Sequence, residues 1–316
     1  MISFIEILRA VAVALITNSH FDGVYPIDIS FGGCPGVSLF FAITGFLLWK
    51  PAKSRGGYRR FTDWYLKKLI RLYVPLTIVN LITVAIRFRE ASISLFLFPI
   101  NINLWYVPAI AVLYILFYLV MTYWPGKRPI VIGITIAVYA LLYIFAYDKS
   151  SFFVEPVIWF RLLYGIIAMM IGSYIREYYD SEKEKRNKSA VLYGGVGVLS
   201  LGAFLVVKLL LSRVDIIMQM QFLTQVFGVA FAAFSMLCGC NCEGLCKKVL
   251  STRIGTVIGV ISKNSLEIYL AQFAIIAYLK NIMFPVNLIA IVIAVVAAGA
   301  AVHSVSEKVI HKILKI

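Results

Sequence analysis

Ten hydrophobic segments, each near the length that a lipid bilayer requires, set the strongest limit on how this chain can fold. They cover residues 2–21, 33–49, 66–86, 104–124, 129–147, 156–175, 190–211, 216–237, 265–282 and 286–303. A helix of about 20 apolar residues spans the hydrocarbon core, where the backbone must satisfy its own hydrogen bonds. Hydrophobic residues make up 61% of the chain and charged residues only 14%, well below a soluble domain. The sequence therefore predicts an all-α, polytopic membrane bundle of about ten transmembrane helices.

The positive charge of the chain follows the order of these segments. The formal net charge is +15, which in a soluble protein would suggest nucleic acid. If the N-terminus lies inside, 22 of the 30 Lys and Arg residues fall in cytoplasmic loops and five fall outside. This asymmetry indicates orientation in a membrane rather than binding of nucleic acid. We expect both termini in the cytoplasm, a multi-pass location in a plasma or bacterial inner membrane, and one domain over 1–316.

The first segment carries ionisable side chains that a membrane helix normally excludes. A charge near the bilayer centre costs roughly 3 kcal/mol or more, so Arg9 and His20 are candidates for function. They are eleven residues apart, close to three helical turns, which puts them on one face about 16 Å apart along the axis. Glu6 lies three residues before Arg9 and can pair with it. The alternative is a structural Glu6–Arg9 pair with an interfacial histidine.

A second cluster of charge lies in the stretch 50–71, "KPAKSRGGYRRFTDWYLKKLIR", in which Asp63 is the sole acid. Its eight cations exceed what orientation requires. Anionic lipid head groups are one candidate partner, and a phosphorylated ligand is the other. The candidate phosphate-binding side chains in this stretch are Arg59, Arg60, Lys67, Lys68 and Arg71.

Four of the five cysteines cluster near position 240, as "CGCNC" followed by Cys246. Their spacing differs from the usual zinc patterns, and they lie on the expected cytoplasmic side, where thiols stay reduced. A metal site and membrane-proximal free thiols, open to acylation, both remain possible. We expect no metal.

Three further polar residues lie within or beside the segments. Arg161, in the segment 156–175, could line the same cavity as the charged residues of the first segment or stay near the outer surface. Glu267 could stabilise the start of the segment at 265–282, since a negative charge is favourable there. His303 lies near the cytoplasmic end of the last segment and is expected at the interface.

Five motifs resemble, in their order, those of the membrane acyltransferase-3 family. They are the Arg9-x10-His20 pair, "GVSLFFAITGFLLWK" (36–50), "FTDWYLKKLIRLYVPL" (61–76), "LWYVPAIAVLYILFY" (104–118) and "ISKNSLEIYLAQF" (261–273). The resemblance covers most of the chain and is densest in the first 120 residues. The family includes O-acetyltransferases that act on bacterial surface glycans.

The resemblance implies transfer of an acyl group, with acetyl the first candidate, from cytoplasmic acyl-CoA to a sugar hydroxyl at or beyond the outer face. Arg9 and His20 fall on the family's Arg-x10-His pair. Lys68 and Arg71 fall on an Arg-x-x-Arg motif, with Lys in the first position. Trp105 and Tyr106 fall on the family's aromatic pair, while Gln272 stands where relatives often carry His. The implied partners are acyl-CoA, a surface or lipid-linked glycan and membrane lipids.

The residues are compatible with that chemistry. The basic stretch could hold the phosphates of CoA at the cytoplasmic mouth, and the uncharged arm could extend past Arg9 toward His20. An imidazole with an ordinary pKa near 6.5 can accept the proton of an acceptor hydroxyl as a general base. Asn18, Ser38, Tyr106 or backbone amides could stabilise the oxyanion.

Two other functions fit a polytopic protein with buried charges. One is a transporter of a glycan or lipid, although the sequence has no inverted repeat of the kind that transporters often show. The other is a non-catalytic partner in a polysaccharide synthesis complex, which predicts that Arg9 and His20 tolerate substitution.

Overall fold

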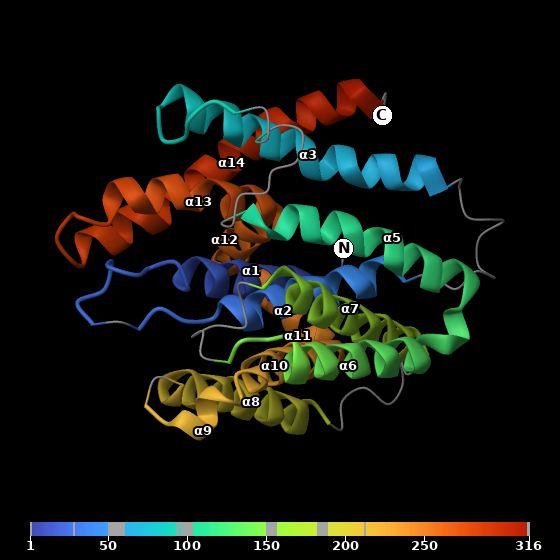
Figure 1. Ribbon diagram of the computed structural model, residues 1–316. Helices are drawn as coiled ribbons and strands as arrows, with labels where there is room; N and C mark the ends of the chain where they lie inside the picture. The colour runs from blue at the N-terminus through green and yellow to red at the C-terminus, as the bar shows by residue number, and fades with distance from the viewer. Residues whose placement is uncertain are drawn as a thin grey trace.

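Helices are the only regular structure in the part of the chain that the computed structural model describes, which is residues 2–27, 29–49, 61–92, 95, 104–149, 157–181, 189–211 and 213–314 (Figure 1). Arg59 and Arg60 lie outside these described residues. The elements are α1 (Ser3–Asn18), α2 (Gly33–Leu48), α3 (Phe61–Ala85), α5 (Tyr106–Tyr123), η3 (Pro125–Lys127), α6 (Arg128–Phe145), α7 (Ile158–Ser181), α8 (Ala190–Leu210), α9 (Asp215–Met218), α10 (Phe222–Asn241), α11 (Glu243–Leu250), α12 (Arg253–Lys263), α13 (Ser265–Leu279) and α14 (Val286–Leu314).

The helices confirm a polytopic membrane protein. Within the described residues, seven stretches are long and apolar enough to cross a membrane, namely α3, α5, η3 with α6, α7, α8, α10 and α14. Two shorter apolar helices, α2 and α13, have 16 and 15 residues. The predicted segment 2–21 forms α1, which ends at Asn18 and carries Glu6 and Arg9. Each of the ten predicted segments thus contains a helix.

The long helices run in roughly the same direction across Figure 1, so that the connections gather at two ends of the bundle. The η3 turn lies at the right-hand end, and α9 and the turn between α13 and α14 lie at the left-hand end. Extensive packing joins α8 to α10, α13 to α14, and α2 to α1, α7 and α10. In a membrane-spanning bundle, the connections between helices lie at the two membrane surfaces, and this arrangement is compatible with that.

Most of α2 is buried, so this helix lies in the interior of the bundle. Leu39, Phe41 and Phe46 have no exposed surface. A helix that is apolar all round belongs in the interior of a bundle. Small residues let α7 approach α2 closely: a Cβ on Gly45 would overlap the carbonyl oxygen of Met169.

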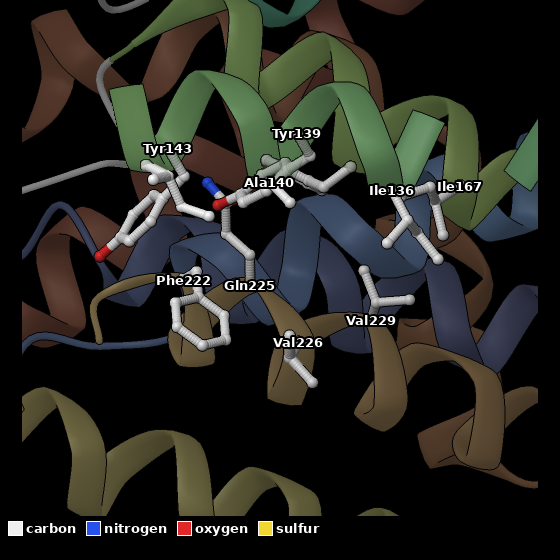
Figure 2. A pocket seen from close by; sticks show the side chains of 11 residues that line it. Ile136, Tyr139, Ala140, Tyr143, Ile167, Phe222, Gln225, Val226 and Val229 are labelled. Carbon is white, nitrogen blue, oxygen red and sulfur yellow. The ribbon is translucent and has the colours of Figure 1, made fainter. Parts of the chain in front are cut away.

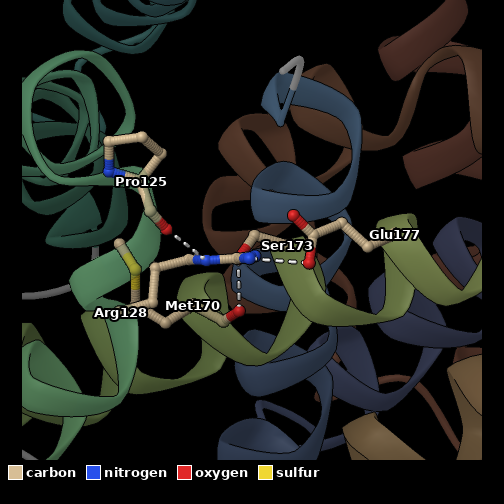
Figure 3. A network of polar contacts seen from close by, with 5 residues as sticks. All are labelled: Pro125, Arg128, Met170, Ser173 and Glu177. Atoms are coloured by element: carbon tan, nitrogen blue, oxygen red, sulfur yellow. Dashed lines mark hydrogen bonds and ion pairs between the residues drawn. The ribbon is translucent and has the colours of Figure 1, made fainter. Parts of the chain in front are cut away.

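A buried arginine joins three elements at the η3 end of the bundle (Figure 3). The Nε of Arg128 donates to a backbone carbonyl of η3 at 3.0 Å, and Nη1 donates to Ser173 Oγ at 2.9 Å. Its Nη2 pairs with Glu177 at 2.6 Å. The guanidinium also lies 4.0 Å from the ring centroids of Trp49 and Tyr174. Because each guanidinium nitrogen makes a hydrogen bond and two rings contact the group, Arg128 fixes α6 against α7 and the end of α2.

The stretch 240–264, which the sequence predicts as a hydrophilic cytoplasmic connection, forms two helices, α11 and α12. Thr252 caps α12 by accepting a hydrogen bond from the Gly255 amide at 3.2 Å. With 8 and 11 residues, both helices are too short to appear as membrane segments. Neighbouring Glu243 reaches α1 and accepts bonds from the amides of Ser3 and Phe4 at 2.8 and 3.0 Å.

Candidate active site

Arg9 lies half-buried on α1, with its guanidinium toward α5. It is within electrostatic range of the hydroxyls of Tyr106 and Tyr114 on α5 and, more weakly, of the Glu6 carboxylate. Among the described residues no direct ion pair joins Glu6 to Arg9. The structure thus surrounds Arg9 mainly with phenolic groups, and the predicted Glu6–Arg9 pair is only a longer-range attraction.

His20 lies just beyond the last residue of α1, where the helix tightens. Its amide donates to the carbonyl of Thr17 at 3.1 Å, a bond that spans three residues. The imidazole packs edge-on against Phe273 of α13, with 4.6 Å between ring centroids. The guanidinium of Arg161 on α7 is within electrostatic range of the imidazole. His20 is therefore held between α13 and α7.

A chain of aromatic rings connects the surroundings of His20 with those of Arg9. Phe273 contacts Tyr269 on the same helix, with 6.0 Å between centroids. Tyr269 then meets Tyr106 of α5 at 5.8 Å, and Tyr106 lies within range of Arg9. Tyr269 is only 4% exposed. Phe273, Tyr269 and Tyr106 thus form one continuous row of rings from α13 and α5, here called the aromatic wall, which extends from His20 to Arg9.

Trp105 and Arg161 form a second part of the same wall. The guanidinium carbon of Arg161 lies 4.0 Å from the Trp105 ring centroid, the geometry of a cation–π contact. Trp105 also contacts Tyr106 at 6.3 Å and Phe41 of α2 at 6.5 Å. The half-buried Arg161 side chain thus lies against Trp105, with its charge in range of His20.

Gln272 helps to position α13 against α1. Its Oε1 accepts a hydrogen bond from the Thr17 hydroxyl at 2.7 Å, and the side chain has no exposed surface. Its Nε2 has no partner in the described part of the chain. Thr17 precedes His20 by three residues and Gln272 directly precedes Phe273, so this bond fixes the contact between the imidazole and its aromatic neighbour.

The described cations of the basic stretch lie on the first turns of α3. Lys67 and Lys68 are half-buried and Arg71 is exposed. Trp64, one turn before Lys68, packs against Tyr114 at 6.0 Å between centroids, and Tyr114 is within range of Arg9. The basic surface therefore continues through aromatic contacts to the Arg9 end of the wall.

Two of the residues expected as oxyanion donors point elsewhere. Asn18 is engaged in the connection that follows α1: its Nδ2 donates to the Phe31 carbonyl at 3.0 Å, and its Oδ1 accepts from Tyr25 at 2.6 Å. Ser38 lies against α10, where a Cβ on Gly228 would lie 3.3 Å from its Oγ. Tyr106 is the one member of that set that lies on the wall.

The match to a known family decides what this arrangement belongs to. Residues 2–303 match the family model described as an acyltransferase domain, of the acyltransferase-3 type. The chain belongs to the acyltransferase-3 family. Neither curated proteins nor solved structures give a match to the chain. The family match confirms the resemblance of the five sequence motifs and makes the protein a membrane acyltransferase, with an acyl donor and an acceptor as substrates.

Sequence reasoning about this acyltransferase overlooked the two α13 side chains that complete the wall. Tyr269 and Phe273 both belong to the motif "ISKNSLEIYLAQF" and are four residues apart, so they share one helix face. That spacing was the available signal. Which helix they face depends on packing between segments that are about 160 to 250 residues apart. The spacing of residues within one helix carries no information about that packing.

Glu267 and His303 form a contact between helices that the sequence does not predict. Glu267 is 6% exposed and contacts His303 Nδ1 across the α13–α14 interface at 3.0 Å. The half-buried histidine thus joins α14 to α13. Glu267 also lies in the first turn of α13, where its negative charge is favourable as the sequence predicts.

No disulfide joins the four described cysteines near position 240: Cys238 and Cys240 lie on α10, Cys242 follows that helix and Cys246 lies on α11. Across the described residues, no group of three or more His, Cys, Asp or Glu side chains could hold a metal ion. Burial and the neighbouring Glu243 carboxylate raise the pKa of the Cys246 thiol to about 11. Cys246 is therefore protonated at neutral pH, a form that binds metals and attacks electrophiles poorly.

Proposed function

We propose that this acyltransferase moves an acyl group, with acetyl the simplest candidate, from cytoplasmic acyl-CoA to a hydroxyl of a cell-surface or lipid-linked glycan. Membership of the family supplies the reaction type. The observation that carries the proposal is the wall of rings from His20 to Arg9, which continues through Tyr114 to the basic surface of α3. A donor bound at that surface would have a continuous route to the imidazole.

The proposed topology has ten spans, with both termini in the cytoplasm of a plasma or bacterial inner membrane and a single domain over 1–316. The shorter helices α2 and α13 would cross within the bundle, where neighbouring helices cover them, and α1 would cross beside α2. Protein neighbours rather than lipid would then surround the charges of α1. This topology puts the start of α3 inside and His20 near the outer end.

Phosphates of the donor would bind at the cytoplasmic end. Arg and Lys are suited to phosphate because they combine charge with several donors. Uncharged donor atoms would extend along the aromatic wall toward His20. The residues assigned to donor binding are Arg59, Arg60, Lys67, Lys68, Arg71, Trp105 and Tyr106.

The chemistry centres on His20, with Arg9 and Glu6 nearer the donor side. The neutral imidazole takes the proton of the acceptor hydroxyl, and the hydroxyl oxygen attacks the thioester carbonyl carbon. The tetrahedral oxyanion collapses as the carbon–sulfur bond breaks, and the CoA thiolate leaves with the proton that the imidazole returns. Tyr106 lies three ring contacts from His20, on the donor side of the wall, and stays assigned to donor binding.

Release of free CoA by the purified protein tests the proposed function directly. Protein in lipid nanodiscs, supplied with acetyl-CoA and acceptor glycan, should release CoA and acetylate the glycan, and His20→Ala should lower that rate about 100-fold or more. His311→Ala is the matched control, because His311 is exposed and near the end of α14. Full activity of His20→Ala would contradict the base assignment. Glycan movement without CoA release would favour a transporter.

Donor binding at α3 has its own test. Lys68→Gln with Arg71→Gln should raise the apparent KM for acyl-CoA about tenfold, since two charge-assisted contacts to phosphate would be lost. Lys308→Gln, an exposed lysine on α14, controls for the loss of positive charge. An unchanged KM together with weaker binding to anionic vesicles would assign Lys68 and Arg71 to lipid head groups instead.

A further inference from the structure

A second arginine joins Arg161 at the His20 end of the aromatic wall. Arg89 follows α3, and its guanidinium lies within electrostatic range of the Tyr269 hydroxyl on α13. Arg161 of α7 lies within range of the same hydroxyl and of the His20 imidazole. Both arginines are half-buried, so each keeps some exposed surface. Two guanidinium groups from different parts of the chain thus approach one hydroxyl, beside the proposed general base.

Arg89 is held in place by its backbone and by its side chain. Its amide donates to the Thr83 carbonyl at 3.2 Å, and its Nη1 donates to Asn80 Oδ1 at 3.1 Å. Asn80 has no exposed surface, so the guanidinium reaches back into the bundle. Neighbouring Glu90 is exposed, and no carboxylate of the described chain forms an ion pair with Arg89. The Arg89 side chain is therefore positioned without being neutralised.

The segment that carries Arg89 is fixed against α13. The Tyr278 hydroxyl donates to the Ile86 carbonyl at 3.3 Å, and Phe88 packs on the Tyr278 ring with 5.8 Å between centroids. Arg89 is one of only five Lys and Arg residues, out of 30, that the sequence places outside. Orientation in the membrane favours cations on the inside, so it does not account for a cation here.

Arg161 contributes the second guanidinium from α7. Its guanidinium carbon lies 4.0 Å from the Trp105 ring centroid, so the indole covers one face of the group. Stacking of this kind occupies a face, whereas a carboxylate or a phosphate accepts from the N–H groups along the edge of a guanidinium. The contact with Trp105 therefore orients Arg161 and is compatible with binding of an anion.

The apolar cavity between α6, α7 and α10 offers a contrast (Figure 2). Its volume is about 460 Å³, and every side chain that lines it is uncharged. An anionic group would lose its hydration there without gaining a counter-charge. At the His20 end of the aromatic wall, by contrast, two arginines supply that counter-charge.

We propose that Arg89 and Arg161 bind an anionic group of the acceptor, a carboxylate or a phosphate on the sugar that becomes acylated. The inference rests on the proposed function and narrows the acceptor to an acidic glycan. The anionic group accepts hydrogen bonds from both guanidinium groups beside Tyr269. This contact holds a neighbouring hydroxyl of the same sugar at the His20 imidazole.

Photolabelling in nanodiscs of phosphatidylcholine tests the site. The probes are hexyl glycosides that differ only at the sixth carbon of the sugar: a glucuronide, a glucoside 6-phosphate and a glucoside, each with a diazirine in the hexyl chain. Crosslinks on α7 and α13 are mapped by peptide mass spectrometry. At least one anionic probe should label the wild type about tenfold more than the glucoside does, as expected for hydrogen bonds to a charged group. The stronger of the two identifies carboxylate or phosphate.

Variants assign this preference to the two arginines. Arg89→Gln should lower labelling by the anionic probe about tenfold and leave labelling by the glucoside unchanged, because Gln donates but carries no charge. Lys280→Gln is the matched control, since it removes an exposed cation directly after α13 and should change neither. Arg161→Gln should act in the same direction as Arg89→Gln. If Arg161→Gln does not fold, Arg89→Gln alone must remove the preference.

Equal labelling by the anionic and neutral probes would overturn the proposal, as would a preference that Lys280→Gln lowers as much as Arg89→Gln. Labelling unchanged in Arg89→Gln, together with a raised KM for succinyl-CoA but not for acetyl-CoA, would move the arginines to a carboxylate of the acyl group. Labelling is measured without acyl-CoA. Failure of CoA release would therefore leave a charge-dependent result standing, and charge-independent labelling of a protein that releases CoA would contradict this inference alone.

Discussion

Arg9 and His20 interact chiefly with residues of other helices rather than with each other. The period of 3.6 residues predicts their common face on α1, and both border the same aromatic wall. The residues that surround them include Tyr269, Phe273 and Arg161, which belong to segments far along the chain. The sequence could therefore single out the two ionisable groups, because charge in an apolar helix is visible locally. Their neighbours depend on how distant helices pack.

The bond from Thr17 to Gln272 makes a prediction at this scale. Thr17→Val keeps the size of the side chain but removes the donor, so Gln272 loses its one partner and α13 can shift against α1. A small displacement of Phe273 would misplace His20, and we expect kcat to fall about tenfold to 100-fold while the KM for acyl-CoA changes little. Steady-state CoA release measures both constants.

Thr135→Val provides the matched control for that change. The Thr135 hydroxyl donates to the Val131 carbonyl of its own helix at 2.7 Å, so its removal breaks no contact between helices. A kcat of Thr17→Val equal to that of Thr135→Val would assign the Thr17–Gln272 bond to stability alone.

At the scale of elements, the length of a hydrophobic segment predicts where a membrane helix forms. Short amphipathic helices are not detected in this way. The segments 33–49 and 265–282 became α2 and α13 within three residues at each end. In contrast α11 and α12 were read as a hydrophilic connection, since no window there approaches the length of a membrane span. Their helical structure depends on local signals such as the Thr252 cap and on packing of α12 against α1. Neither signal resembles a hydrophobic run.

The contact between α2 and α7 yields a prediction about stability. A Cβ on Gly172 would overlap the carbonyl oxygen of Ala42, which is backbone and cannot rotate away. Gly172→Ala must therefore separate the two helices, at a cost of about 1–3 kcal/mol. The Tm in detergent should fall accordingly.

Gly195→Ala is the control for the general effect of replacing a helical glycine. Its added Cβ would meet no atom within 4 Å on α8, so the loss of backbone freedom in the unfolded chain should leave the Tm unchanged or slightly higher. Equal Tm values for Gly172→Ala and Gly195→Ala would mean that α2 and α7 tolerate a wider separation.

At the scale of the molecule, the proposed function puts donor binding at one end of the bundle and acyl transfer at the other. The basic surface at the start of α3 is suited to phosphates, while His20 lies beyond the far end of α1 near Arg161. An acyl group would be delivered from one side and accepted on the other, with the aromatic wall between them. That division requires α1, α2 and α13 to cross the membrane, although these three are not among the seven stretches of the described chain that meet a simple criterion of length and composition.

Cysteine accessibility tests the crossing of α13. From Gly126 in η3 to Met283 the chain passes through α6, α7, α8, α10 and α13, and α11 and α12 are too short to cross. Five crossings put the two positions on opposite sides, whereas four would put them on the same side. In a background with all five native cysteines changed to Ser, Met283→Cys should react with an impermeant maleimide in intact cells. Gly126→Cys and Ile313→Cys should react only after the membrane is opened. Labelling of Met283→Cys and Gly126→Cys from the same side would remove α13 from the spans, and His20, which packs on Phe273, would no longer have a wall that reaches the outer face.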